Sequence, residues 1–339
     1  MFSLQHLWAR TSVFTMLLSP LALLFAAISG LRRLAYRRGW LASSSVGVPL
    51  IVVGNITAGG SGKTPLTIWL VNWLHAQGYH PGVISRGYGG AARGCVEVQA
   101  TSLAAEVGDE PVLIRFKTDA PVVVGRDRVA AARTLLANHP EVDVLVSDDG
   151  LQHYRLQRDI ELAVIDAETG LGNGWPLPAG PLREPVRRLK QVDAVIQVVR
   201  GAVQPRGDLP VTNWRADYTA GLVYRLRVPL ATLPLGELPA LDWLAVTGIG
   251  RPQGFFDMLQ AAGMRFRPRA FADHHAFQPQ DLPADGAVVM TEKDAVKCLT
   301  FAGADWWALQ LDVAPEPGFI DWLSARIKQD HHSRMRREV

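Results

Sequence analysis

Apolar and polar positions along this chain follow two patterns, one typical of buried strands and one typical of helices. Short apolar runs rich in β-branched residues predict strands at residues 50–53, 81–85, 121–124, 142–146, 160–165 and 192–198. Apolar positions three and four apart predict helices between these runs, at residues 66–74, 112–116 and 127–138. Because strands and helices alternate, the pattern predicts an α/β fold with a mostly parallel sheet and helices on both faces.

The second half of the chain predicts a smaller α/β domain. Alternation predicts strands at residues 222–228 and 306–313, which we expect to pair as a two-stranded linker or hinge. A polar connection over residues 202–217 precedes them, and they enclose predicted strands at 244–247 and 286–291, a helix at 254–262, and a short helix after Lys293. A last helix at 320–328 and a basic tail follow, so the expected parts are 1–40, 41–215, 216–314 and 315–339.

Residues 11–31 form an uncharged, mostly apolar segment between two arginines. A membrane span needs about 20 apolar residues, which this segment just provides, although Pro20 would kink a helix there. A cleaved signal peptide with small residues at 27–29 and a buried core helix are the alternatives. We favour membrane association, whether the segment spans, re-enters or lies at the interface. The arginines at 32–38 then place the following domain in the cytoplasm.

Charge and cysteine content exclude some classes of protein. The 339 residues carry a formal net charge of only +3, but no acidic residue occurs before Glu97. This asymmetry indicates contact with an anionic membrane surface near the N-terminus, and we expect no nucleic acid as a partner. Cys95 and Cys298 are the two cysteines, which excludes a disulfide framework and any metal site built on clustered cysteines, and favours a reducing compartment.

A glycine-rich turn between the first strand and its helix predicts a phosphate loop for ATP. The predicted nucleotide contacts are its residues Thr57, Ala58, Gly59, Gly60, Ser61, Gly62, Lys63 and Thr64. Backbone amides and the helix N-terminus would face the phosphates, the Lys63 ammonium would neutralise charge, and the Thr64 hydroxyl would contact Mg²⁺. Thr57 stands where the strict motif has glycine, so the motif alone is imperfect, and a plain glycine-rich turn is the alternative.

Acidic residues follow or precede several predicted elements. Asp148 and Asp149 follow the strand at 142–146 after Ser147, where a phosphate-loop protein holds its Mg²⁺; a plain turn is the alternative. Asp109 and Glu110 precede a helix; they either favour its positive end or face a reactive centre.

Other polar residues are candidates for the same pocket. Gln152 and His153 follow the aspartates closely, and the loop residue Arg86 either contacts phosphate or substrate or is solvated. Residues 273–275, Asp-His-His, can orient an imidazole for proton transfer or serve only the structure.

Read together, these motifs resemble one family across nearly the whole chain. The strings GNITAGGSGKTP, SRGYGG, GDEP, SDDGLQH, LPAGPLREP, DHHAF and TEKDAVK occur in this order. The set resembles the tetraacyldisaccharide 4'-kinases, the lipid A 4'-kinases of Gram-negative bacteria. The resemblance implies a phosphate-loop kinase-type fold of two α/β domains joined by a two-stranded linker. It also implies transfer of the ATP γ-phosphate to the 4'-hydroxyl of a tetraacylated glucosamine disaccharide 1-phosphate, which forms lipid IVA at the cytoplasmic face of the inner membrane.

The resemblance also implies roles for individual residues. Asp109 and His274 match the acid–imidazole pair that activates the sugar hydroxyl, with Lys63 assisting catalysis. Asp148 and Asp149 match the acids that hold Mg²⁺ and water. Glu110 is carried over as a further metal residue, and Arg86, Gln152, His153 and Arg183 as substrate residues.

Two switches are the competing functions. A membrane-bound phosphate-loop ATPase that controls a protein partner would need neither an acid–imidazole pair nor an acceptor pocket. A guanine-nucleotide switch would carry an Asn-Lys-x-Asp motif, which the string at 292–294, Glu-Lys-Asp, does not match.

Overall fold

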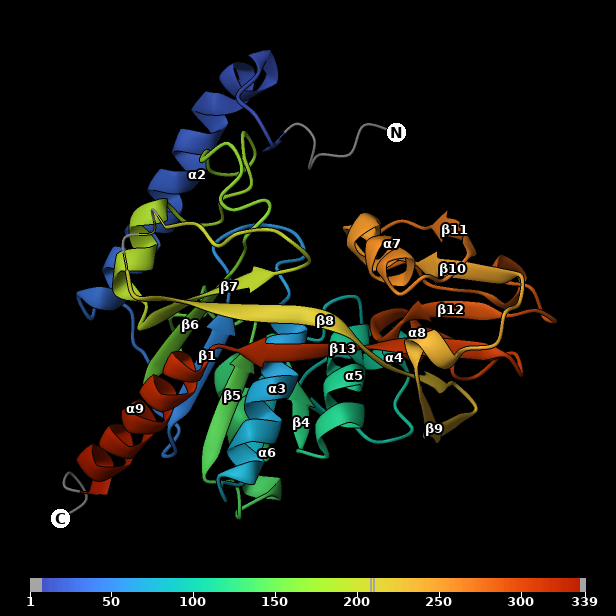
Figure 1. Ribbon diagram of the computed structural model, residues 1–339. Coiled ribbons are helices and arrows are strands. Elements are labelled where there is room, and N and C mark those ends of the chain that lie inside the picture. The colour runs from blue at the N-terminus through green and yellow to red at the C-terminus, as the bar shows by residue number, and fades with distance from the viewer. Residues whose placement is uncertain (1–7, 208, 210, 336–339) are drawn as a thin grey trace.

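One continuous mixed sheet runs through the molecule. In the computed structural model, which describes residues 8–207, 209 and 211–335, the sheet contains 13 strands (Figure 1). Its larger part consists, in spatial order, of β8 (Asn213–Arg225), β7 (Ala194–Val199), β6 (Ile160–Asp166), β1 (Leu50–Gly54), β5 (Val144–Asp148), β2 (Pro81–Ser85), β4 (Val122–Val124) and β3 (Val96–Glu97). From β8 to β4 all neighbours are parallel, as predicted from the alternation of strands and helices.

Helices cover both faces of this larger part. One face packs against α3 (Lys63–Ala76), α5 (Asp109–Thr118) and α9 (Pro317–Met335), through buried residues such as Leu70, Ile114 and Phe319. The other face packs against α6 (Arg128–Asn138) and the segment around η1 (Val186–Gln191). The short helix α4 (Ala104–Val107) precedes α5. The predicted layer order is therefore confirmed.

The two parts of the sheet are joined by two long strands. β8 pairs antiparallel with β13 (Trp306–Pro315), from Arg225 opposite Trp307 to Ala216 opposite Pro315. This pairing confirms the predicted two-stranded linker. Two details of the prediction were wrong. Residues 213–217, predicted as connection, belong to β8 because they pair with β7, and a turn interrupts the predicted strand 222–228 before β9 (Val228–Pro234) pairs back on β8.

The smaller part continues the same sheet beyond β13. Its strands are β12 (Val288–Thr291), β10 (Trp243–Thr247) and the edge strand β11 (Phe266–Ala270), with α7 (Pro252–Ala261), α8 (Glu292–Cys298), η2 (Leu235–Glu237) and η3 (Pro279–Asp281). β11 escaped prediction because arginine and proline occupy an exposed edge and leave no apolar pattern. The last helix was predicted too short, since it extends to Met335; of the predicted tail, residues 336–339 lie outside the described residues.

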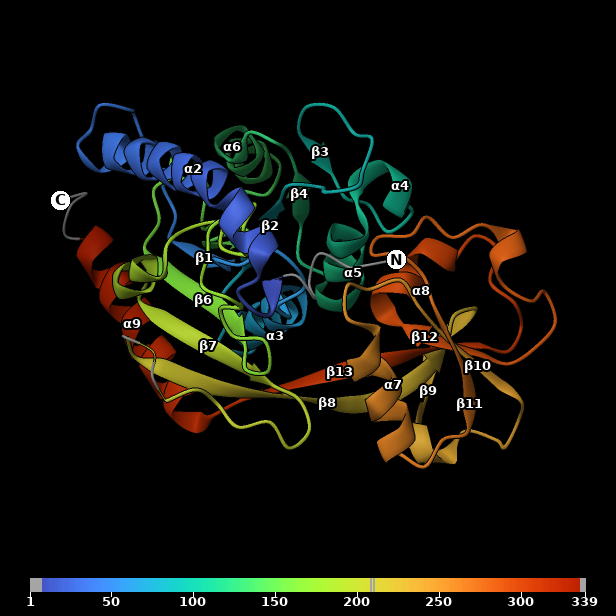
Figure 2. The same ribbon diagram turned by 90° about the horizontal axis from the view of Figure 1, so that it is seen from above.

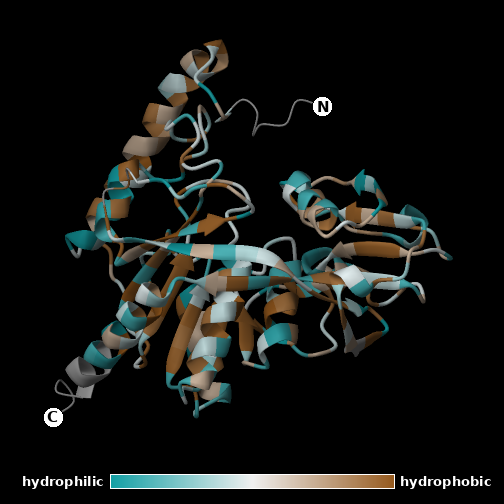
Figure 3. Cartoon of the chain, viewed as in Figure 1, coloured by the Kyte–Doolittle hydropathy of each residue, from teal (hydrophilic) through white to brown (hydrophobic). Residues whose placement is uncertain are grey.

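The apolar N-terminal segment forms the helix α2 (Val13–Arg37), which contains Pro20 and projects beyond the sheet (Figure 1). It is long and apolar enough to cross a membrane, and only 11% of its most apolar window is buried. In Figure 3 most of the helix is coloured as apolar. Its inner side packs on the rest of the chain, with Thr15, Ala22 and Arg33 buried. Asn173 donates from Nδ2 to the Thr15 hydroxyl at 3.5 Å, and Arg32 donates to the Gln152 carbonyl at 3.5 Å. The outer side is left without a partner among the described residues.

Candidate active site

The glycine-rich turn lies between the end of β1 and the start of α3, as the sequence predicted. Gly59 and Gly62 adopt positive φ angles of 106° and 86°, which glycine tolerates at little cost. The Asn55 side chain spans the loop by donating to the Ser61 hydroxyl at 3.0 Å. Thr57 makes a backbone bridge with Leu182 and does not adopt a positive φ, so glycine is not required at this position. The loop backbone therefore has a conformation suited to binding an anion, although the sequence motif is imperfect.

Lys63 and Asp149 lie together at the start of α3. Lys63 Nζ is 3.5 Å from Asp149 Oδ1, and Arg183 Nη1 donates to both Asp149 oxygens at 3.1 and 3.2 Å. Burial would raise the pKa of Asp149, but the two cations outweigh it and lower the pKa to about 2. Asp149 is therefore ionised, and it holds Lys63 and Arg183 in one place.

Asp148 is the most deeply buried acid at this site, with 1% of its surface exposed. Its Oδ1 accepts from the Thr67 hydroxyl at 3.2 Å, one helical turn after Thr64, while Oδ2 has no hydrogen-bond partner among the described residues. Burial raises the pKa of Asp148, and the carboxylates of Glu110 and Asp149 raise it further. A buried carboxylate oxygen without a partner is costly, and a bound cation would remove that cost.

The residues present fit Mg²⁺ only if other ligands join them. Within the described part of the chain, no group of three or more His, Cys, Asp or Glu side chains could hold a metal ion alone. Mg²⁺ commonly binds one or two carboxylates and takes its remaining ligands from water and nucleotide phosphates. Asp148 beside a phosphate loop matches that ligand set.

Asp109 and His274 meet at the junction of the two parts of the sheet. Asp109 opens α5 in the larger part, and His274 follows β11 in the smaller part; the distance from His274 Nδ1 to Asp109 Oδ2 is 3.1 Å. His274 adopts φ 57°, and its backbone N–H donates to the Gly248 carbonyl at 3.0 Å. The predicted proximity of these two residues is thus observed, although they are separated by 165 positions.

The surroundings of the pair affect both groups. The hydrogen bond to Asp109 raises the pKa of His274 above its ordinary value, against the opposing effects of burial and Lys293. Burial would raise the pKa of Asp109, but His274, Lys293 and Lys297 together lower it. The pair therefore favours a carboxylate beside a protonated imidazole, and one proton can be held between the two groups.

Two lysines that sequence reasoning missed complete this junction. α5 packs against α8, where Lys293 Nζ is 3.0 Å from Glu110 Oε1 and 4.0 Å from Asp109 Oδ2 (Figure 2). Lys297 Nζ also lies 4.0 Å from Asp109 Oδ2. Their spacing of four positions on one helix was the available signal, because such residues share a face. Glu110, predicted as a metal residue, is hydrogen-bonded to Lys293 in this structure.

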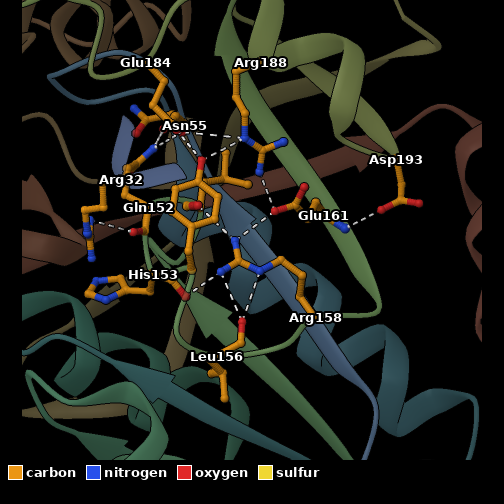
Figure 4. A network of polar contacts seen from close by, with 12 residues as sticks. Arg32, Asn55, Gln152, His153, Leu156, Arg158, Glu161, Glu184, Arg188 and Asp193 are labelled. Carbon is orange, nitrogen blue, oxygen red and sulfur yellow. Dashed lines mark hydrogen bonds and ion pairs between the residues drawn. The ribbon is translucent and has the colours of Figure 1, made fainter. Parts of the chain in front are cut away.

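Gln152 belongs to a polar network beneath the phosphate loop (Figure 4). Its Nε2 donates to the Asn55 carbonyl and to Glu184 Oε2, each at 3.0 Å. Glu184 also accepts from the Tyr154 hydroxyl, which in turn accepts from Arg188 Nε at 3.1 Å. This network ties the loop carrying Gln152 to the base of the phosphate loop.

Two other predicted substrate residues lie around this network. The half-buried His153 has its pKa lowered to about 4 by burial, with Arg128 and Arg86 contributing, so it is neutral near pH 7. Arg86 lies at the end of β2 and lines a cavity.

A second cluster missed by the sequence reasoning lies on the β6 side of the loop. Asp166 ends β6 and accepts from Arg200 and from Arg251, whose Nη1 is 2.7 Å from Asp166 Oδ1. Arg251 also donates to the Gly60 carbonyl, which joins the smaller part to the phosphate loop. Asp166 follows a buried strand just as Asp148 does, so the same signal would have identified it.

The pH behaviour of His274 provides a direct check of the observed hydrogen bond. We expect an NMR titration to place the His274 midpoint above the ordinary value of about 6.5. Asp109→Asn should lower it, because the carboxylate that favours the imidazolium is lost. The stabilisation from this contact is present at low pH and disappears as the pH rises through the raised pKa.

His139 provides the internal control for this titration. Its pKa is raised by Glu97, distant from the junction, and should not respond to Asp109→Asn. An unchanged His274 midpoint in the Asp109→Asn variant would contradict the contact.

Comparison with known proteins agrees with this arrangement. A family model described as tetraacyldisaccharide-1-P 4'-kinase matches residues 14–328. The chain is 67% identical over 327 residues to a tetraacyldisaccharide 4'-kinase of Thiobacillus denitrificans, covering 96% of this chain and 99% of that protein. It is 52% identical over 326 residues to the protein of the same name from an Azoarcus species, covering 95% and 94%.

A solved structure shows the same architecture. LpxK from Aquifex aeolicus, determined in complex with ATP, superposes with a TM-score of 0.79 at 26% sequence identity. The similarity covers 92% of this chain and 99% of that one.

Proposed function

This chain belongs to the tetraacyldisaccharide 4'-kinase family, and we propose that it transfers the γ-phosphate of ATP to the 4'-hydroxyl of a tetraacyldisaccharide 1-phosphate through the residues described above. The product would be lipid IVA, a precursor of lipid A in lipopolysaccharide biosynthesis. The observation that carries the residue assignment is the 3.1 Å contact between Asp109 and His274 near the phosphate loop. A nucleotide switch has no use for this pair, and the relatives named above are kinases, so the switch is not supported.

The phosphate side of the reaction depends on charge. The amides of residues 57–62 would bind the ATP phosphates, and the Lys63 ammonium would move from Asp149 towards them. Asp148 and the Thr64 hydroxyl would hold Mg²⁺, with Asp149 orienting water around it; Mg²⁺ would neutralise charge on the transferred group. Arg183, which donates to Asp149, would keep that carboxylate in place when Lys63 turns towards ATP.

The acceptor side depends on proton transfer. A sugar hydroxyl is a weak nucleophile, and a positioned base typically gains about 10²–10⁴-fold in rate. The Asp109–His274 pair would accept the proton of the 4'-hydroxyl, and Lys293 and Lys297 would hold Asp109 in its carboxylate form. Because the pair contains one residue from each part of the sheet, it forms only when the two parts are together.

The site also suggests where the enzyme works. The outer side of α2 exposes large apolar residues, among them Leu17 at 70% and Leu21 at 56%. Arg32, Arg37 and Arg38 at the end of this helix are exposed and would meet anionic lipid headgroups, whereas Arg33, expected to do the same, is buried with 7% of its surface exposed. We infer that α2 places the active site at the cytoplasmic face of the inner membrane, where the lipid acceptor lies.

Lys63→Ala should nearly abolish phosphoryl transfer. With ATP and a tetraacyldisaccharide 1-phosphate, the native protein should add one phosphate to the lipid, detected by mass spectrometry. Removal of a preorganised charge from a transition state costs about 10²–10³-fold, so the variant should lose at least that much. The exposed residue Lys190 provides the matched control, since Lys190→Ala should keep the native rate. Near-native transfer by Lys63→Ala would reject the phosphate-loop assignment.

Membrane binding should depend on α2. Deleting residues 1–30 should release the protein from membranes and lower activity on lipid presented in bilayers, while ATP binding persists. A gentler variant, Leu17→Glu with Leu21→Glu, alters only the exposed side and leaves the contacts of Thr15 and Arg32 intact. It should also lower co-sedimentation with vesicles, because charge on this side opposes insertion. Undiminished sedimentation of both proteins would show that another surface is the anchor.

A further inference from the structure

A buried aspartate lies behind the Asp109–His274 pair, in the smaller part of the sheet. Asp294 lies in the first turn of α8, within the string TEKDAVK, and none of its surface is exposed. Its polar contacts lead to both members of the pair through one intervening residue each. Burying a carboxylate costs free energy unless hydrogen bonds and a cation compensate it, so these contacts decide what the residue does.

One carboxylate oxygen of Asp294 holds the ends of two strands together. Its Oδ2 accepts from the Thr247 hydroxyl at 3.0 Å and from the Gly248 amide at 2.9 Å, at the end of β10. It also accepts from the Thr291 hydroxyl at 2.6 Å, at the end of the neighbouring strand β12. Hydrogen bonds to an ionised acceptor are roughly twice as strong as those between neutral groups, so these three donors fix the end of β10.

The same segment fixes the backbone of His274. The Gly248 carbonyl accepts from the His274 N–H at 3.0 Å. His274 adopts φ 57°, a left-handed conformation that is unfavourable for residues other than glycine and persists only where the surroundings fix it. Gly248 also lies close against Asp294, since a Cβ added to it would be 3.3 Å from Asp294 Oδ1. Asp294 therefore reaches the His274 backbone through two successive hydrogen bonds.

The other oxygen of Asp294 leads to Asp109 through a lysine. Asp294 Oδ1 is 2.7 Å from Lys297 Nζ, and the same ammonium is 4.0 Å from Asp109 Oδ2. Only 8% of the Lys297 side chain is exposed, and its ammonium also lies over the Phe277 ring, 5.0 Å from the centroid. The ion pair with Asp294 thus determines where the cation beside Asp109 lies.

Two oxygens of one side chain therefore support the two members of the pair. We propose that Asp294 is a positioning residue for phosphoryl transfer, an inference that rests on the proposed function. Through Gly248 it holds the His274 backbone. Through Lys297 it holds a cation against the Asp109 carboxylate. Its contribution is geometric, because displacing a reacting group by about 1 Å can cost on the order of 10²-fold in rate.

The test separates positioning from stability. Asp294→Asn keeps the volume and one oxygen for the three donors, but its amide cannot form an ion pair with the Lys297 ammonium. With ATP and a tetraacyldisaccharide 1-phosphate, kcat should fall roughly 10–100-fold while the KM for ATP stays near the native value. In the His274→Ala background the same substitution should change kcat little, because Asp294 acts only through the pair.

A neutral pair gives the sharper comparison. Lys297→Met alone leaves the buried Asp294 carboxylate without its cation, so the Tm should fall. Asp294→Asn with Lys297→Met removes both charges, so the Tm should recover towards the native value. The kcat of this double variant should stay low, because no cation is held against Asp109.

A second buried lysine–acid pair is the matched control. Lys117 Nζ is 2.8 Å from Glu292 Oε1, and this pair joins the same two helices, α5 and α8. Its contacts lead to the linker strand, where Glu292 Oε2 accepts from the Leu311 N–H at 3.3 Å, and not to Asp109 or His274. Lys117→Met with Glu292→Gln should therefore keep the native kcat.

Several results would overturn the inference. They are a native kcat in Asp294→Asn, a native kcat in the neutral double variant, and an undiminished effect of Asp294→Asn in the His274→Ala background. If these variants do not fold, Thr247→Val decides instead, since it removes one donor to Oδ2 and little volume. It should lower kcat at a near-native KM for ATP, and a native kcat would overturn the inference. A native protein that adds no phosphate to the lipid would reject the proposed function itself.

Discussion

The antiparallel pairing of β8 with β13 joins two α/β units into one sheet, and the geometry of the site depends on it. β8 pairs with β7 on one side and with β13 on the other, so its thirteen residues reach from the nucleotide-binding part into the smaller part. This linker brings α8 against α5 and the turn after β11 against Asp109. Polar contacts also cross this junction: His274 with Asp109, Lys293 with Glu110, and Arg251 with Asp166.

Charged groups lie beside apolar contacts such as Phe116 with Tyr224, and the charges determine the chemistry of the site. Three acids of the site differ in how their charge is compensated: Asp149 is ionised between two cations, Asp109 is held as a carboxylate by an imidazole and two lysines, and Asp148 is buried with one oxygen lacking a partner among the described residues. The carboxylates of Asp149 and Asp109 are already compensated by cations. A cation bound to Asp148 would offset the free-energy cost of burying its unpaired oxygen, so metal and nucleotide binding would stabilise the folded protein.

Much of the larger part was predictable from the sequence, because its central strands are buried on both faces and therefore read as continuous β-branched runs. The phosphate loop was predictable for a similar local reason, since strand, glycine turn and Gly-Lys-Thr are contiguous. The pairing of Asp109 with His274 could not be predicted from local pattern, because 165 positions separate the two residues. The family resemblance predicted it. The residue pattern alone left both of them with a structural alternative.

The site residues that were not predicted depend on contacts between elements that are distant in the sequence. Lys293, Lys297 and Arg251 look like solvated charges until α8 and the loop before α7 are placed against the larger part. β11 and β9 carry too little alternation to be detected, and β8 begins within a stretch whose composition is that of a loop. Asp294 likewise joins the ends of two strands, β10 and β12, that are neighbours only in the folded sheet.

The central claim is that Asp109 and His274 act as one unit across the junction. The most direct measurement is a double-mutant cycle on the transfer rate at saturating ATP, with Asp109→Ala, His274→Ala and the combined variant. If the two residues act as a unit, the double variant should be scarcely slower than the slower single variant. His275→Ala is the matched control, since His275 is bonded to Asp281 and not to Asp109; its effect should multiply with that of Asp109→Ala. Multiplicative losses for Asp109 and His274, or a native rate in His274→Ala, would contradict the account.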